Sequence, residues 1–244
     1  MTELRAAAHV HSDWSYDGSW TLGRLAEAFA KRGYGAVLTA EHDRGWNSER
    51  WERYKEACAR ASTASLVIVP GIEYADASDT VHVPVWGAPF LTPGLPTVEL
   101  LVLAREHGAF ALLAHPARRD AWRLFEPAWA ESLSGIEVWN RKYDGWAPSP
   151  TALELTCSYP GLVQMVGLDF HTHRQFFPLS LDLRLSDKAN VGAVLEALRT
   201  RRFSSVVGRF EVKAFSNGAA RRGAAGAEWA RRRAATTLRK LRNA

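Results

Sequence analysis

The chain has 244 residues, a length that a single large α/β domain commonly reaches. Hydrophobic residues make up 47% of it, which is enough for a sizeable core. No run of about 18 apolar residues is present, so we expect no membrane contact through a spanning helix. The only cysteines, Cys58 and Cys157, are too few for a disulfide framework or a thiolate metal site. With no signal-peptide pattern at the start, they lead us to expect a cytoplasmic location.

The net charge of +5 is concentrated at the C-terminus. Residues 218–244 carry eight basic side chains and one acid, a net charge of +7, which leaves the remainder of the chain at −2. A basic tail of this kind can contact an oligonucleotide. The favoured alternative is the solvated face of a helix, because the tail is rich in alanine and arginine.

Predicted strands and helices alternate along the chain. The helix at 21–32, for example, places Leu22, Leu25, Ala26 and Phe29 on one face. In chain order we predict strand 4–8, helix 21–32, strand 36–39, helix 48–61, strands 66–69 and 81–86, helix 97–107, strands 110–114, 136–139 and 163–168, and helix 190–201. This order predicts a parallel α/β architecture of roughly seven strands.

Six of the eight histidines fall in short motifs where these strands end. They are His9, His11, His42, His82, His115 and His171. Carboxylates occupy the same kind of position at Asp17, Glu73, Glu137 and Asp169. Functional residues of an α/β barrel come from the C-terminal ends of many strands. The barrel is therefore favoured over a doubly wound sheet, which brings fewer strand ends to one point.

The pairs His9/His11 and Asp169/His171 each have i, i+2 spacing, which places both side chains on one face of a strand. Each motif alone is a weak signal: His82 could be a core histidine and Asp17 a turn residue. Together they supply nitrogen and oxygen ligands without thiolate, which suits zinc, manganese or iron. The set is too large for one tetrahedral ion, so two or three divalent metal ions are expected.

In this order the motifs resemble the polymerase and histidinol phosphatase (PHP) family of metal-dependent phosphoesterases. The matching elements are His9-Val10-His11-Ser12 with Asp17-Gly18, Glu41-His42-Asp43, Gly71-Ile72-Glu73, His82, Ala114-His115-Pro116 and Gly167-Leu168-Asp169-Phe170-His171. The resemblance implies a distorted (β/α)7 barrel with a trinuclear metal centre at the C-terminal ends of the strands. On this basis residues 1–210 would form the barrel and residues 211–244 a basic, helical extension.

The resemblance also implies a ligand set for each metal. His9, His11, Glu73 and Asp169 would hold the first ion, Glu73 would bridge to a second held by His82 and His115, and Asp17, His42 and His171 would hold the third. Two positions depart from the family. Glu41 stands where many members have aspartate, and the Asp17 position is histidine in some branches. The third site is therefore expected to be the weakest.

The implied chemistry is hydrolysis of a phosphoric ester through a metal-bridging hydroxide. Arg118 or Arg119 could hold a phosphate oxygen, and either could instead lie at a solvated helix start. His173 and Asp43 are candidates for protonating the leaving group, although His173 could equally be a rim residue. Lys142 and Arg44 are weaker candidates for contacting the phosphate, and Glu137 is expected behind the metal ligands.

The expected substrate is a phosphomonoester of a small metabolite or nucleotide. One alternative is a 5′–3′ exonuclease or phosphodiesterase on short RNA or DNA, which the basic tail and several tryptophans in loops would serve. Another, of a different class, is a non-catalytic metal-binding regulatory module. The oligomeric state is left open by the sequence.

Overall fold

The computed structural model describes residues 2–242, with side chains described up to residue 237. Its strands form two six-stranded sheets. In the first, β1, β2 and β4 are parallel, and β10, β11 and β12 extend the sheet in antiparallel fashion beyond β1. These strands are β12 (Phe210–Glu211), β11 (Phe203–Val207), β10 (Leu179–Leu185), β1 (Thr2–Val10), β2 (Ala36–Thr39) and β4 (Val67–Val69), in spatial order.

The second sheet carries the later strand ends. Its order is β3 (Glu41–His42), β5 (Gly71–Ala75), β6 (His82–Trp86), β7 (Phe110–Leu113), β8 (Gly135–Asn140) and β9 (Val163–Gly167). β7, β8 and β9 are parallel, whereas β6 is antiparallel to both β5 and β7. Only residues 76–81 join β5 to β6. This connection is too short for a crossover helix, so the two strands pair as a hairpin.

The two sheets meet at both sides. β2 leads into β3 across Ala40, and β4 leads into β5 across Pro70. On the other side the chain beyond β9 returns to β1, where Leu168 N donates to Ala8 O at 3.0 Å and His11 N donates to Phe170 O at 2.9 Å. The ends of β1, β3, β5, β7 and β9 are thereby gathered in one region.

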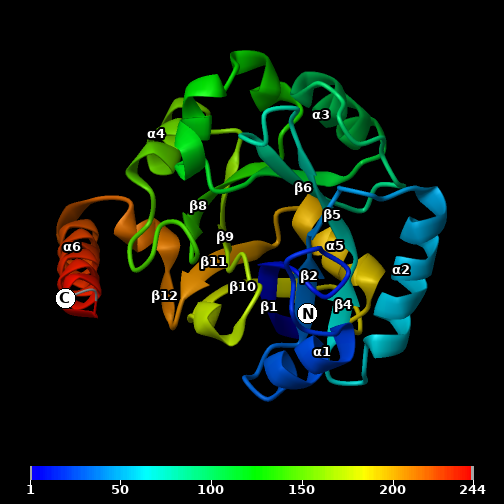
Figure 1. Cartoon of the computed structure of the whole chain (residues 1–244). Helices are drawn as coiled ribbons and strands as arrows, with labels where there is room; N and C mark the ends of the chain where they lie inside the picture. The colour runs from blue at the N-terminus through cyan, green and yellow to red at the C-terminus, as the bar shows by residue number, and fades with distance from the viewer. Residues whose placement is uncertain (1, 243–244) are drawn as a thin grey trace.

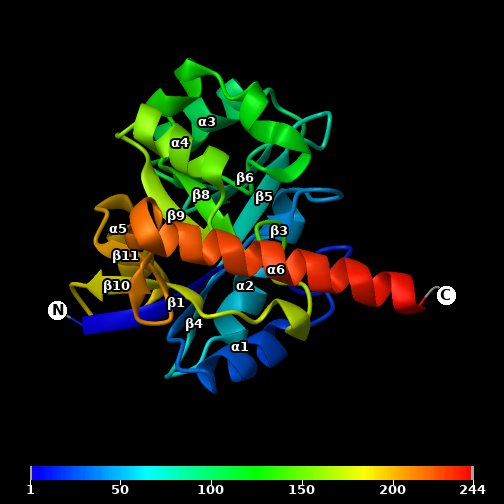
Figure 2. The same ribbon diagram turned by 90° about the vertical axis from the view of Figure 1, so that its left-hand side faces the viewer.

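The helices lie around the outside of the sheets (Figure 1). They are α1 (Leu22–Ala30), α2 (Ser48–Ala61), α3 (Thr97–Glu106), α4 (Pro150–Ser158), α5 (Val191–Arg199) and α6 (Gly218–Arg242), with 3-10 turns η1 (Arg118–Leu124), η2 (Pro127–Glu131), η3 (His173–Gln175) and η4 (Val212–Phe215). The longest of them, α6, runs along one side of the molecule (Figure 2). Within residues 2–242, no helix has the length and apolarity to cross a bilayer.

The α/β class is as predicted, and so is the buried face of α1. The strand arrangement differs from the prediction. The described residues do not form a single closed barrel of parallel strands, because β6, β10, β11 and β12 run antiparallel to their neighbours. α4 was also missed. No helix was expected between the strands at 136–139 and 163–168, but Ser149 caps one there and Pro150 occupies its first turn.

Candidate metal centre

The carboxylate of Glu73, in the middle of β5, lies at the centre of the histidine cluster. Its Oε1 is 3.1 Å from a ring nitrogen of each of His9, His82 and His115. Its Oε2 is 3.0 Å from His42 Nδ1 and 3.7 Å from His11 Nε2. Glu73 is 1% exposed, so five imidazoles surround a buried carboxylate. One carboxylate with this many neighbours is suited to bridging two cations.

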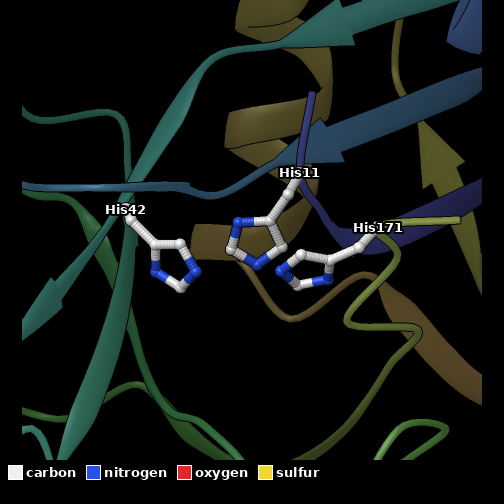
Figure 3. Close-up of side chains that lie close together, drawn as sticks. All are labelled: His11, His42 and His171. Carbon is white, nitrogen blue, oxygen red and sulfur yellow. The ribbon is translucent and has the colours of Figure 1, made fainter. Parts of the chain in front are cut away.

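Two further carboxylates complete the cluster. Asp169 Oδ1 lies 3.6 Å from His11 Nε2 and 3.3 Å from His171 Nδ1, and Asp169 Oδ2 lies 3.8 Å from His115 Nε2. Asp17 lies 2.9 Å from His171 Nε2 and 3.4 Å from His42 Nε2. Figure 3 shows the rings of His11, His42 and His171 converging on one space from three separate segments. All nine residues that the sequence suggested as ligands therefore lie together.

The backbone is unusual at three of these positions. His9, His115 and Asp169 have φ angles of 59°, 28° and 47°, a region that residues other than glycine rarely enter. At His9 the β1–β2 register also shifts between Ala8 and Val10. Such strained residues persist where the surroundings enforce them, and they cluster at functional sites. Here the strain coincides with the side chains that face Glu73.

Glu137, in β8, fixes His9 from behind. His9 Nδ1 donates to Glu137 Oε1 at 3.0 Å, which directs Nε2 at Glu73. The other oxygen, Oε2, accepts from His115 N at 2.8 Å and from Asn140 Nδ2 at 2.7 Å. A Cβ at Gly167 would lie 1.6 Å from Glu137 Oε1, so glycine is needed there.

Glu41 plays a similar part for His11. Ser15 Oγ donates to Glu41 Oε2 at 2.5 Å, so the 3.3 Å contact between Ser15 Oγ and His11 Nδ1 has the imidazole as donor. Glu41 also accepts from Ser12 N, Ser12 Oγ and Tyr54 OH. Glu41, completely buried, therefore orders the loop after β1 instead of facing the cluster.

The cluster fits divalent cations on two grounds. Among the described residues, His9 Nε2, His11 Nε2, His82 Nδ1 and His115 Nδ1 are buried without a hydrogen-bond partner, an arrangement that ordinarily costs stability. The first three face Glu73. In addition, ligand atoms about 2.1 Å from a tetrahedral ion lie about 3.4 Å from one another. The distances between histidine nitrogens and the carboxylate oxygens of Glu73 and Asp169, 3.0–3.8 Å, lie on either side of this value.

The electrostatics around His9 and His42 favour positive charge. Burial alone would lower the pKa of His42, but hydrogen bonds from its ring to Asp17 and Glu73 raise it to about 10. Burial would likewise lower the pKa of His9, and the charges of Glu137, Glu73 and Asp169 raise it well above its usual value. The carboxylates that stabilise these protonated imidazoles would equally stabilise bound metal cations in place of the protons.

A cavity of about 180 Å³ opens onto this cluster and is called the metal cavity below. It is lined by Tyr16, Asp17, His42, Glu73, His82, His115, Arg118, Lys142, Tyr143 and Asp169. Lys142 Nζ lies 3.3 Å from Asp169 Oδ1. Tyr143 packs on His115 with ring centroids 4.8 Å apart. Tyr16 and Tyr143 were not among the expected site residues, although they directly adjoin Asp17 and Lys142 in the chain.

Of the four candidate catalytic residues, one lines the metal cavity and three do not. Arg118 lines the metal cavity, where Asp79 Oδ2 holds it at 2.8 Å and its Nη1 lies 3.2 Å from His82 Nε2. Arg119 binds the same Asp79, is 56% exposed and does not line the cavity. Asp43 accepts from Ala75 N, and His173 lies exposed in η3. Neither Asp43 nor His173 lines the metal cavity, so this placement does not favour them as proton donors.

No protein-family model and no curated protein matches the chain. Several solved structures do resemble it. A two-domain protein from Bacteroides vulgatus, containing a predicted PHP-like metal-dependent phosphoesterase, superposes with a TM-score of 0.64 and 20% identity over 84% of this chain and 65% of its own. The chain shares its fold with this protein.

Two other solved structures extend the comparison. PsfC from Pseudomonas syringae has a TM-score of 0.63 and 18% identity, covering 89% of this chain and 97% of its own. The lesion-specific endonuclease PfuEndoQ from Pyrococcus furiosus has a TM-score of 0.60 and 12% identity, covering 82% and 56%. This chain thus spans less than two thirds of the Bacteroides protein and of the endonuclease. At these identities the likeness establishes the fold, and the resemblance noted in the sequence is confirmed at that level.

Proposed function

We propose that this chain is a metal-dependent phosphoesterase that hydrolyses a phosphomonoester of a small metabolite or nucleotide. The convergence of six histidines and three carboxylates in one cluster is the observation that carries this proposal. Four overlapping sets within it have ligand atoms close enough to share an ion, which supports two or three divalent ions of manganese, zinc or iron. We also propose that strands drawn from both sheets, which the hydrogen bonds between β1 and the segment after β9 join, make up one distorted seven-stranded barrel.

The ions, when bound, would supply an activated water and neutralise phosphate oxygens. The chain itself supplies the rest. Arg118 and Lys142 bring positive charge to the wall of the metal cavity and would bind the phosphate oxygens. Burial alone would lower the pKa of Lys142, but Asp169 raises it, so its ammonium stays charged at neutral pH. Glu137 and Ser15 hold the rings of His9 and His11 in the orientation that binding needs.

The test is hydrolysis of a panel of phosphomonoesters by the purified chain in the presence of manganese. The same panel is run with His9→Ala, which removes a ligand from the centre of the cluster. Turnover by the wild type that is lost in the variant supports the proposal. Turnover no greater than that of His9→Ala across the panel contradicts it.

Cleavage of short RNA or DNA is the second candidate, with the basic tail as the oligonucleotide contact. It shares the metal centre, and only the leaving group differs. The structure offers one observation that weakens this use of the tail: Arg231 and Arg232, two of its basic side chains, pair with Glu228. Truncation after residue 217 should reduce the salt-dependent affinity for oligonucleotides if the tail binds them. Unchanged affinity would argue against this candidate.

A further inference from the structure

A second, larger pocket lies beside the metal cavity. Its volume is about 950 Å³, within the range of roughly 300–1,000 Å³ that small-molecule sites occupy. Arg118 and Tyr143 line both spaces, so the larger one, called the side pocket below, begins where the metal cavity ends. A phosphoester held at the metal cavity therefore has room for its alcohol portion in the side pocket.

Three parts of the chain build this pocket. η1 and the residues just before it contribute one wall, which includes Trp122, and residues 143–151 contribute a second. The third wall is α6, through Ala225, Glu228, Trp229 and Arg232. The basic C-terminal segment is thus part of a pocket next to the candidate catalytic centre.

Specific hydrogen bonds to Glu228 attach α6 to this position. Glu228, 6% exposed, accepts a hydrogen bond from Trp146 N at 2.9 Å and is bound by Arg231 and Arg232. Gly145, with a φ of 75°, lets the chain pass Glu228 closely: a Cβ there would lie 2.4 Å from Glu228 Oε2. A helix resting loosely on the surface would not need such a fit.

The lining of the pocket indicates the kind of group it takes. Trp122, Tyr143 and Trp229 present aromatic surface, and Ala117, Ala147 and Pro148 add apolar surface. Aromatic side chains stack on planar rings. Asp144 lies in the same wall and is 7% exposed. Its carboxyl group adds a polar group that can form directional hydrogen bonds. Burial raises its pKa to about 8, so this carboxyl carries a proton at neutral pH and can donate a hydrogen bond.

We infer that the side pocket holds the leaving group of the substrate, that this group is a nucleoside, and that α6 is the wall that selects it. This inference rests on the proposed phosphoesterase function of the metal cavity. Stacking on the indole rings would recognise the base, and the metal cavity would hold the phosphate. The C-terminal helix then acts in substrate specificity.

Two matched variants of the full chain test this inference. Ala225→Trp fills the side pocket from α6. Ala230→Trp places the same ring on the same helix at an exposed position outside the pocket. Hydrolysis of adenosine, guanosine, cytidine and uridine 5′-monophosphates is compared with that of methyl phosphate, whose leaving group is too small to reach the pocket. For the preferred nucleotide, Ala225→Trp should raise KM about tenfold or more, a loss of one decade in affinity. With methyl phosphate its kcat/KM should stay within about twofold, and Ala230→Trp should match the wild type on both substrates.

Calorimetric titration with the four free nucleosides keeps the inference separate from catalysis. At least one should bind the wild type and Ala230→Trp, and bind Ala225→Trp at least about tenfold more weakly. If no phosphoester is hydrolysed but this difference in binding is found, the proposed function fails, while the side pocket remains a nucleoside site with α6 as its selecting wall. The assignment is overturned if no nucleoside binds, or if Ala225→Trp leaves both nucleoside binding and nucleotide KM unchanged. An equal loss on nucleotide and methyl phosphate also overturns it.

Discussion

At the scale of single residues, the side chains that hydrogen-bond to the candidate metal ligands are as closely fitted as the ligands themselves. Gly167→Ala would place a Cβ 1.6 Å from Glu137 Oε1 and displace the carboxylate that orients His9. Because such supporting contacts set ligand orientation, we expect manganese affinity to fall by roughly 10- to 100-fold. The matched control is Gly161→Ala, which has open space around its Cβ. Equal manganese affinity of the two variants by titration calorimetry would contradict this role of Glu137.

Arg118 and Lys142 line the metal cavity, whereas Arg119 is held by Asp79 outside it. Removing a charged hydrogen-bond donor to the phosphate should cost about 1.5–3 kcal/mol, so Lys142→Ala should lower kcat/KM by roughly 10- to 100-fold. On methyl phosphate, whose leaving group is too small to reach the side pocket that Arg119 lines, Arg119→Ala should stay within about twofold of the wild type. Steady-state kinetics on one phosphomonoester decides between the two residues, and a larger loss in Arg119→Ala would reverse the assignment.

The sequence located this site through residues that follow strands. His9, Glu73 and His115 stand in motifs whose spacing is visible in the chain, and strand ends meet at one edge. Tyr16, Tyr143 and Asp79 could not be predicted, because they lie in connections whose paths depend on tertiary packing. Arg118 and Arg119 could not be separated from sequence either, since Asp79 binds both and directs only one of them to the cavity.

At the scale of elements, the contact between α6 and residues 145–146 depends on the ionised form of Glu228. Burial alone would raise the pKa of Glu228, but hydrogen bonds from Arg231, Arg232 and Trp146 N lower it to about 2. A carboxyl whose folded pKa is lowered stabilises the fold above its unfolded pKa, and this contribution is lost as the pH falls toward 2. Hydrogen exchange should therefore show α6 protected at pH 6 and released toward pH 2.

Glu228→Gln removes this charge at every pH. It should raise the exchange rate of the α6 amides at pH 6 while leaving the amides of α1 unchanged. Equal protection of α6 in the wild type and Glu228→Gln would mean that other contacts hold the helix.

Elements with clear local signals were predicted well, and those that depend on distant partners were not. The helix at 48–61 and the strand at 36–39 have the predicted bounds, because Asn47 caps the first and an apolar run forms the second. β10 was missed because its alternating stretch, Leu179 to Leu185, follows none of the motifs that located the other strands; in the sheet it lies between β1 and β11. It is ordered by pairing with β1 along five residue pairs, far away in the sequence.

At the scale of the whole molecule, the metal centre joins strands that have few other reasons to meet. Glu73 comes from β5, His9 from β1 and His115 from the end of β7. A cation shared by these strands binds the folded chain and not the unfolded one. At 100 times its Kd, it should stabilise the fold by about 2.7 kcal/mol per site. Thermal unfolding should therefore shift upward with added manganese and return on chelation, and a Tm independent of manganese would contradict a site that spans the sheets.

The most direct test of the account is the metal content of the chain after saturation with manganese and removal of free ion. Because Glu73 contacts five imidazoles and is placed to bridge two ions, the wild type should retain two or three ions per chain. Glu73→Gln, which keeps the shape of the side chain and removes its charge, should retain at most one. Less than one ion per wild-type chain, or equal metal content in the two proteins, would contradict a metal centre built on Glu73.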